Sequence, residues 1–88
     1  MAMVRFDSNT PILLAESDLK IRNAFQPILD EFQINNPTFV EDGYQVLQED
    51  DSTKFELIIL GSSLEGLSAP KVVAALRSDG KNKETPIL

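Results

Sequence analysis

Two clusters of polar residues directly follow apolar runs in this 88-residue chain, and they are its best candidates for chemistry. In open α/β sheets, functional sites lie beyond the carboxyl ends of the strands, which is where these clusters fall. A carboxylate there could bind a hard cation or act as a base, and a hydroxyl could accept a transferred group. The residues concerned are Glu16, Ser17, Gly61, Ser62 and Ser63.

Composition excludes several kinds of chemistry. The chain has no Cys, so it has neither disulfides nor a thiol nucleophile. It has no His, so it has neither an imidazole metal site nor a Ser-His-Asp relay. Lys and Arg number 8 against 14 Asp and Glu, and the resulting net charge of -6 argues against a nucleic-acid partner. No apolar stretch is long enough to span a membrane, and residues 1–10 read as a short leader and not a signal peptide. We therefore expect a cytoplasmic protein.

Hydrophobic patterning predicts the elements that position the two clusters. Uninterrupted apolar runs at 11–15 and 57–60 are typical of parallel strands buried on both faces, and 38–40 and 86–88 are shorter strand candidates. A stripe from Leu19 to Phe32 predicts a helix with a core-facing side, which Pro27 should kink or shorten.

Two further segments have helical patterns. Residues 44–48 predict one or two helical turns followed by a solvated acidic loop at 49–52, and Ser68 should cap a helix that ends near Gly80. The alternation of strands and helices predicts a doubly wound α/β sheet with helices on both faces. Residues 86–88 look like a central strand, so either the domain is cut short or another chain supplies its missing flank.

Four segments, in this order and spacing, resemble response-regulator receiver domains across residues 11–88. They are the strand and acidic turn at 12–22, the acidic-Asp-Gly sequence at 41–43, the apolar strand at 55–60 and the strand entry at 83–88. The resemblance implies a flavodoxin-like, receiver-type parallel sheet in three α/β/α layers, with the first four strands present. It also implies aspartyl phosphorylation by a histidine kinase, assisted by a magnesium ion on an acidic pair.

The residues at the implied phosphorylation pocket depart from this pattern. Aligned on the first strand and Arg22, the acidic pair falls on Glu16 and Ser17, so Glu16 is the only acidic-pair position retained. The phosphoacceptor falls on Gly61, which has no side chain to phosphorylate. The chain also ends before the family's switch hydroxyl and its active-site Lys. The resemblance therefore implies a degenerate receiver with no metal site and no cofactor.

These observations predict a signal-transduction module that works by protein contact, without aspartyl phosphorylation, and that is not an enzyme. Its expected partners are a histidine kinase, an output domain or a second copy of itself. One alternative is an interaction fragment completed by dimerisation or by another chain. A second is a small-molecule or anion binder at the cleft between Glu16 and Gly61. The segment 61–68 also approaches a phosphate-binding loop, but it has Leu67 where that loop needs Lys.

Overall fold

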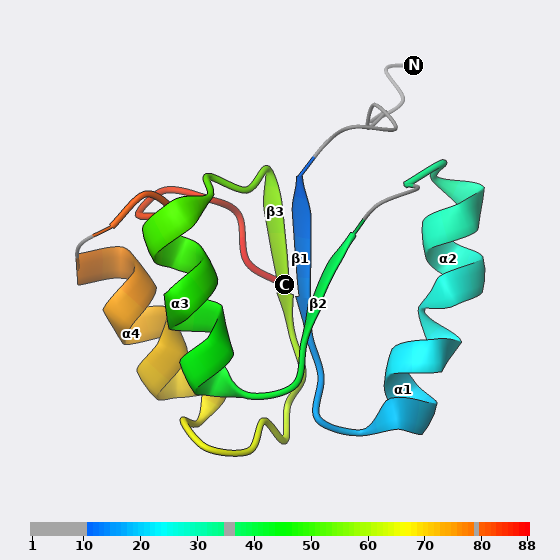
Figure 1. Ribbon diagram of the computed structural model, residues 1–88, viewed down its shortest axis with the longest axis horizontal. Helices are drawn as coiled ribbons and strands as arrows, with labels where there is room; N and C mark the ends of the chain where they lie inside the picture. The colour runs from blue at the N-terminus through cyan, green and yellow to red at the C-terminus, as the bar shows by residue number, and fades with distance from the viewer. Residues whose placement is uncertain (1–10, 35–36, 79) are drawn as a thin grey trace.

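A three-stranded parallel sheet with the order β2-β1-β3 organises the computed structural model, which describes residues 11–34, 37–78 and 80–88 (Figure 1). The strands are β1 (Ile12–Ala15), β2 (Thr38–Val40) and β3 (Leu57–Leu60). The helices are α1 (Leu19–Ala24), α2 (Gln26–Glu31), α3 (Gly43–Ser52) and α4 (Ala69–Ser78). Helices α1 and α2 cover one face of the sheet and α3 and α4 the other, as the sequence predicts. The leader predicted for residues 1–10 lies outside the described residues.

The central strand β1 is fully buried, in agreement with its uninterrupted apolar sequence. It pairs with β2 through Leu13 and Thr38, and with β3 through Ile12 and Leu57. Strand β3 was also predicted to be buried on both faces, and this prediction is wrong for most of its length. Only Ile58 is buried in β3, because one face of this strand has no helix above it.

The predicted fourth strand is a single bridge in the structure. Ile87 bridges to Ile58 of β3, the Leu88 amide donates to the Ile58 carbonyl, and the Leu60 amide donates to the Leu88 carbonyl. The segment therefore lies next to β3, on the side away from β1. The order of neighbouring segments across the sheet is β2, β1, β3 and residues 86–88.

The first helical segment begins and breaks where the sequence predicts. Asp18 caps α1 by accepting a hydrogen bond from the Lys20 amide at 2.8 Å, and Pro27 lies in the first turn of α2 after the break at Phe25. The prediction that the stripe from Leu19 to Phe32 belongs to the core is wrong. Only Leu29 of this stripe is buried and Phe25 is partly buried, because these are the stripe residues that pack with Ile12 and Leu57 of the sheet.

Helix α3 is longer than its sequence suggests. The predicted solvated loop at 49–52 is helical, and Asp50 within it is buried with 5% exposure. This prediction is wrong because the Asp50 carboxylate accepts hydrogen bonds from the backbone amide and the side-chain amide of Asn82, at 3.0 and 2.8 Å. A distant partner thus extends a helix whose local sequence looks solvated.

The two faces of the sheet are unequally packed. The larger cluster of buried side chains lies between the sheet and α3 and α4, and it includes Leu13, Val46, Ile58, Val72 and Leu76. The cluster beneath α2 consists of only Ile12, Leu29 and Ile34. Within the described ranges, no helix has the length and hydropathy needed to cross a membrane.

Candidate functional site

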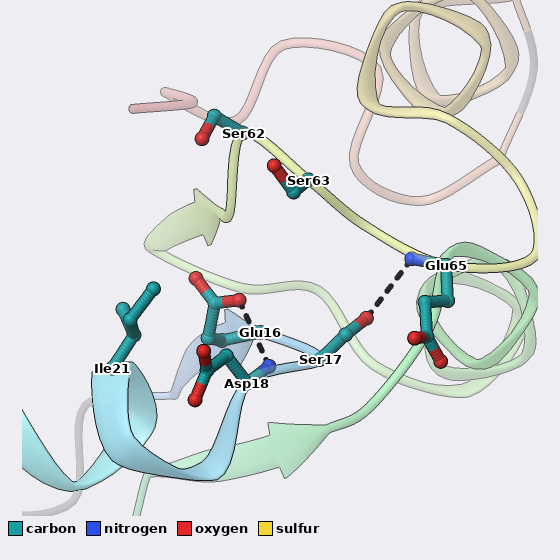
Figure 2. Close-up of a pocket in the computed structure, with 7 residues that line it drawn as sticks. All are labelled: Glu16, Ser17, Asp18, Ile21, Ser62, Ser63 and Glu65. Atoms are coloured by element: carbon teal, nitrogen blue, oxygen red, sulfur yellow. Dashed lines mark hydrogen bonds between the residues drawn. The ribbon is translucent and has the colours of Figure 1, made fainter.

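The ends of β1 and β3 meet at one edge of the sheet and border a shared cleft (Figure 2). The Gly61 amide donates to the Ala15 carbonyl at 2.8 Å, which fixes the two strand ends side by side. Glu16, Ser17, Ser62 and Ser63 line a cleft of about 370 Å³, together with Asp18, Ile21 and Glu65. The structure therefore brings together the residues that the sequence singles out. Their role as a functional site stays a prediction.

Glu16 occupies the space above Gly61. This side chain is buried, with 4% exposure, and its Oε2 accepts a hydrogen bond from the Asp18 amide at 3.1 Å. A Cβ atom on residue 61 would overlap with Oε1 of Glu16. A carboxylate is therefore present at this position, but β1 supplies it and not the residue that follows β3.

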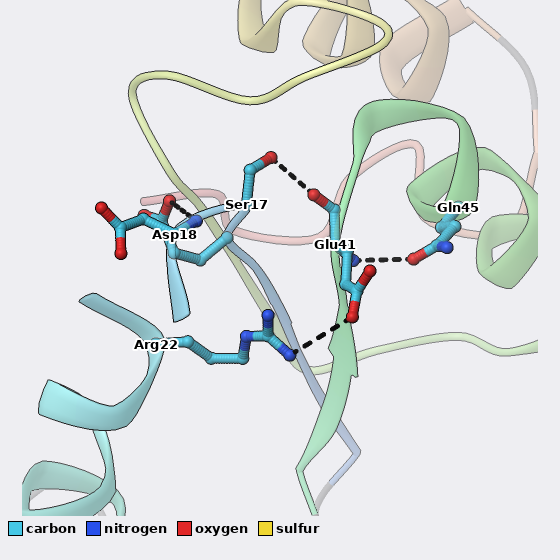
Figure 3. Close-up of polar contacts among 6 residues, drawn as sticks. Ser17, Asp18, Arg22, Glu41 and Gln45 are labelled. Atoms are coloured by element: carbon cyan, nitrogen blue, oxygen red, sulfur yellow. Dashed lines mark hydrogen bonds and ion pairs between the residues drawn. The ribbon is translucent and has the colours of Figure 1, made fainter. Parts of the chain in front are cut away.

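The Ser17 hydroxyl connects two loops. It donates to the Glu41 carbonyl at 2.5 Å, after β2, and accepts from the Glu65 amide at 2.9 Å, before α4 (Figures 2 and 3). The Gly43 amide also donates to the Glu65 carbonyl at 3.1 Å. The neutral Ser17 side chain thus holds the loop after β2 and the loop before α4 together. It does so from the position at which the receiver pattern has a carboxylate that binds the metal.

Arg22, which helps to align the sequence with receiver domains, lies behind this cluster. One guanidinium nitrogen is 3.8 Å from Oε1 of Glu41, whose backbone amide donates to Oε1 of Gln45 at 2.7 Å (Figure 3). Among the described residues, Nε of Arg22 is the buried side-chain polar atom without a hydrogen-bond partner. Arg22 therefore packs at the base of the first helix and does not line the cleft.

The donor set at this cleft does not fit the magnesium ion that the receiver fold implies. Magnesium favours several oxygen ligands with at least one or two carboxylates in near-octahedral order. Gly61 offers no side chain, and the Ser17 hydroxyl is a neutral ligand that already donates one hydrogen bond and accepts another. Within residues 11–34, 37–78 and 80–88, no group of three acidic or other ligating side chains could hold a metal.

Sequence reasoning missed three lining residues: Asp18, Ile21 and Glu65. Asp18 is adjacent to the predicted pair and could have been found as a cleft residue as well as a helix cap. Glu65 could not be found locally, because it reaches the cleft only through the hydrogen bond to Ser17, 48 residues away. Three carboxylates at one cleft make it acidic, which disfavours the anion binder considered from the sequence.

Comparison with known proteins decides the fold. A chemotaxis response regulator of Vibrio cholerae matches with a TM-score of 0.77 and 22% identity, over 89% of this chain and 64% of its own. A response regulator from Hahella chejuensis matches with a TM-score of 0.74 and 29% identity, over 90% and 61%. The chain has the fold of a response-regulator receiver domain. No protein-family model matches the sequence, and none of the curated proteins does either.

Another receiver-domain structure contains the ion that this cleft does not fit. The receiver domain of a sensor histidine kinase from Pseudomonas aeruginosa carries a magnesium ion in its active-site cleft, and it matches with a TM-score of 0.80 at 20% identity. The alignment covers 89% of this chain and 63% of that receiver domain. This chain therefore spans less than two thirds of the receiver-domain chains described here.

Replacing Ser17 with alanine should lower the free energy of unfolding by about 1–2 kcal/mol, because two hydrogen bonds between the loops are lost. Urea denaturation followed by circular dichroism measures this change. The matched control is Ser63→Ala, an exposed cleft serine, for which we expect a change within about 0.5 kcal/mol. Equal effects of the two variants would contradict the connecting role of Ser17.

Proposed function

We propose that this chain is a receiver-type module of two-component signalling that transmits information by protein contact, without aspartyl phosphorylation. One observation carries the proposal: the residue after β3 is Gly61, and the Glu16 carboxylate fills the space that an acceptor side chain would take. A phosphoryl group needs a nucleophile to accept it; residue 61 has no side chain to supply one, and the Glu16 carboxylate above it is buried, with 4% exposure. The module is not an enzyme in this proposal.

The surrounding residues support the same proposal. Ser62 and Ser63 have hydroxyls near the cleft, but a neutral hydroxyl is a poor nucleophile unless a base removes its proton. The acidic lining from Glu16, Asp18 and Glu65 repels the phosphoryl donor, and within the described residues no group of three ligating side chains could hold a cation to offset that repulsion. The proposed partners are a histidine kinase, an output domain or a second copy of the chain, in the cytoplasm.

Treatment with magnesium and acetyl phosphate, or with beryllofluoride, tests the proposal directly. We expect no gain of a phosphoryl group by intact mass, and no saturable NMR shifts at residues 16–17 or 61–63, because the acceptor carboxylate is absent. A receiver domain with an intact acceptor aspartate, treated in parallel, shows that the reagents are active.

Two outcomes would overturn the proposal. One is a stoichiometric phosphoryl adduct that forms on the wild-type chain but not on a Ser62→Ala, Ser63→Ala double variant. That result would show that a serine is the acceptor. The other is saturable beryllofluoride binding centred on the cleft. Either result would show that the cleft performs phosphoryl chemistry despite Gly61.

A further inference from the structure

The loop between β3 and α4 contains a turn, residues 64–67, whose ends and middle are held in different ways. Leu64 is buried in the larger core cluster, and Leu67 packs against the same cluster. The two residues between them, Glu65 and Gly66, are exposed. Apolar burial therefore fixes the ends of the turn, whereas the path of the exposed pair depends on the contacts that its backbone makes.

The exposed pair is held by contacts to Ser17, Gly43 and Tyr44, the first of which comes from the cleft. The Glu65 amide donates to Oγ of Ser17 at 2.9 Å (Figure 2). The Glu65 carbonyl accepts from the Gly43 amide at 3.1 Å. A Cβ on Gly66, which has a φ of 73°, would lie 3.0 Å from Cδ2 of Tyr44. Because Gly66 has no Cβ, the Tyr44 ring lies close against its backbone.

The Ser17 hydroxyl makes this arrangement discrete. One atom, Oγ, accepts from the Glu65 amide and donates to the Glu41 carbonyl at 2.5 Å (Figure 3). A serine side chain occupies staggered rotamers, and a change of rotamer moves Oγ by roughly 2 Å, which is enough to break both hydrogen bonds together. The contact between the cleft and the turn is therefore either complete or lost.

We propose that Ser17 is a conformational switch that couples the cleft to the surface formed by Tyr44 and Gly66. In one rotamer its hydroxyl holds Glu65, which keeps Gly66 against the Tyr44 ring and keeps the Gly43 amide hydrogen-bonded. In another rotamer Glu65 is released, the Gly43 amide loses its acceptor and the ring loses its contact. A molecule that turns the hydroxyl from within the cleft thus changes the exposed surface around Tyr44.

The coupling acts in both directions, because linkage between two sites is reciprocal. A protein that binds Tyr44 in contact with Gly66 favours the rotamer in which Ser17 holds Glu65. Tyr44 is 59% exposed and accessible to such a protein. The inference rests on the proposed function for its purpose, since it gives the contact module a connection between the cleft and a surface. The coupling itself requires no phosphoryl chemistry.

Native-state hydrogen exchange of the wild-type chain, followed by NMR, tests the coupling without any variant. The Glu65 and Gly43 amides should have equal protection factors, within about threefold, because one opening event releases both. Both should exchange about tenfold or more faster than the amide of Leu14, in the buried central strand. Protection factors for Glu65 and Gly43 that differ by more than this would overturn the proposal.

Ser17→Ala should raise the exchange rate of the Gly43 amide about tenfold or more relative to that of Leu14, a ratio that removes any change in global stability. Tyr44 is the only Tyr and the chain has no Trp, so intrinsic fluorescence reports this ring alone. Its quenching by acrylamide should increase in the same variant. The matched control is Ser63→Ala, which removes an exposed hydroxyl from the same cleft and should change neither measurement.

Tyr44→Ala tests the coupling from the other end. It should raise the exchange rate of the Glu65 amide about threefold or more relative to that of Leu14, whereas Gln48→Ala, at an exposed residue one turn further along α3, should not. The proposal is wrong if Ser17→Ala leaves Gly43 and Tyr44 unchanged, or if Glu65 does not respond to Tyr44→Ala. These measurements use no phosphoryl donor, so this proposal and the proposed function can each fail alone.

Discussion

Replacing Asn82 with alanine is expected to lower the free energy of unfolding by about 3–5 kcal/mol, the largest effect we predict for a single side chain. Asn82 is fully buried. Its Oδ1 accepts from the Phe55 amide at 2.6 Å, and its Nδ2 donates to the Asp50 carboxylate at 2.8 Å and to the Thr53 carbonyl at 2.7 Å. The alanine variant leaves these buried groups without their partner. Urea denaturation followed by circular dichroism measures the loss.

The size of this loss matters because a chain of this length is stabilised by only about 4–13 kcal/mol. A suitable control is Ser78→Ala, whose exposed hydroxyl donates to the Ala75 carbonyl at 3.0 Å, and which should change the stability by less than about 0.5 kcal/mol. If Asn82→Ala lowered the free energy of unfolding by less than about 1 kcal/mol, water would be replacing the hydrogen bonds of Asn82 at little cost. That result would contradict its role in anchoring residues 80–86 to α3.

Gly43→Ala should destabilise the chain by about 2–4 kcal/mol and displace the loop between β3 and α4. A Cβ on residue 43 would overlap with the Leu67 carbonyl oxygen and lie 2.8 Å from Cβ of Leu67 and from Cγ2 of Val72. These atoms belong to the backbone and to the buried core, so none can turn aside. Denaturation gives the stability, and amide NMR shifts at residues 61–68 report the loop.

Gly61→Ala provides the matched comparison. Its Cβ would overlap with the end of the Glu16 side chain, which borders the cleft and can rotate into it. We expect a loss of less than about 1 kcal/mol, accompanied by a shift at the Asp18 amide as its hydrogen bond to Glu16 breaks. If both glycine variants lost the same stability, the clash at Gly43 would not be the cause of its larger predicted effect.

Strands and helix starts could be predicted because their signals are local. The apolar run that forms β1, the Asp18 cap and the break near Pro27 each depend on residues within a few positions. The length of α3 could not be predicted, because Asp50 finds its partner 32 residues away. The exposure of Ile28 and Phe32 was missed for a related reason. A stripe shows which side of a helix is apolar, but not how much of it the sheet can cover.

Four of the residues that line the cleft were predictable, but the geometry of the cleft was not. Parallel strand order alone places residue 16 near residue 61, so the cleft follows from the sequence. The sequence does not show that the Glu16 side chain turns over Gly61, or that the Ser17 hydroxyl connects Glu41 with Glu65. These contacts depend on side-chain rotation and on a loop conformation set by Gly43.

The parallel pairing of strands that are distant in the sequence has a consequence for how the chain folds. Within the described residues every strand pairing is parallel, and β1 pairs with residues as distant as Leu57, so none of these pairs can form as a local hairpin. Closing such long loops before any contact is gained makes folding slow compared with helical proteins of equal size. During synthesis, the apolar residues 12–15 leave the ribosome long before β3 exists to pair with them. Until β3 is made, these apolar residues are without their strand partner and are prone to aggregation.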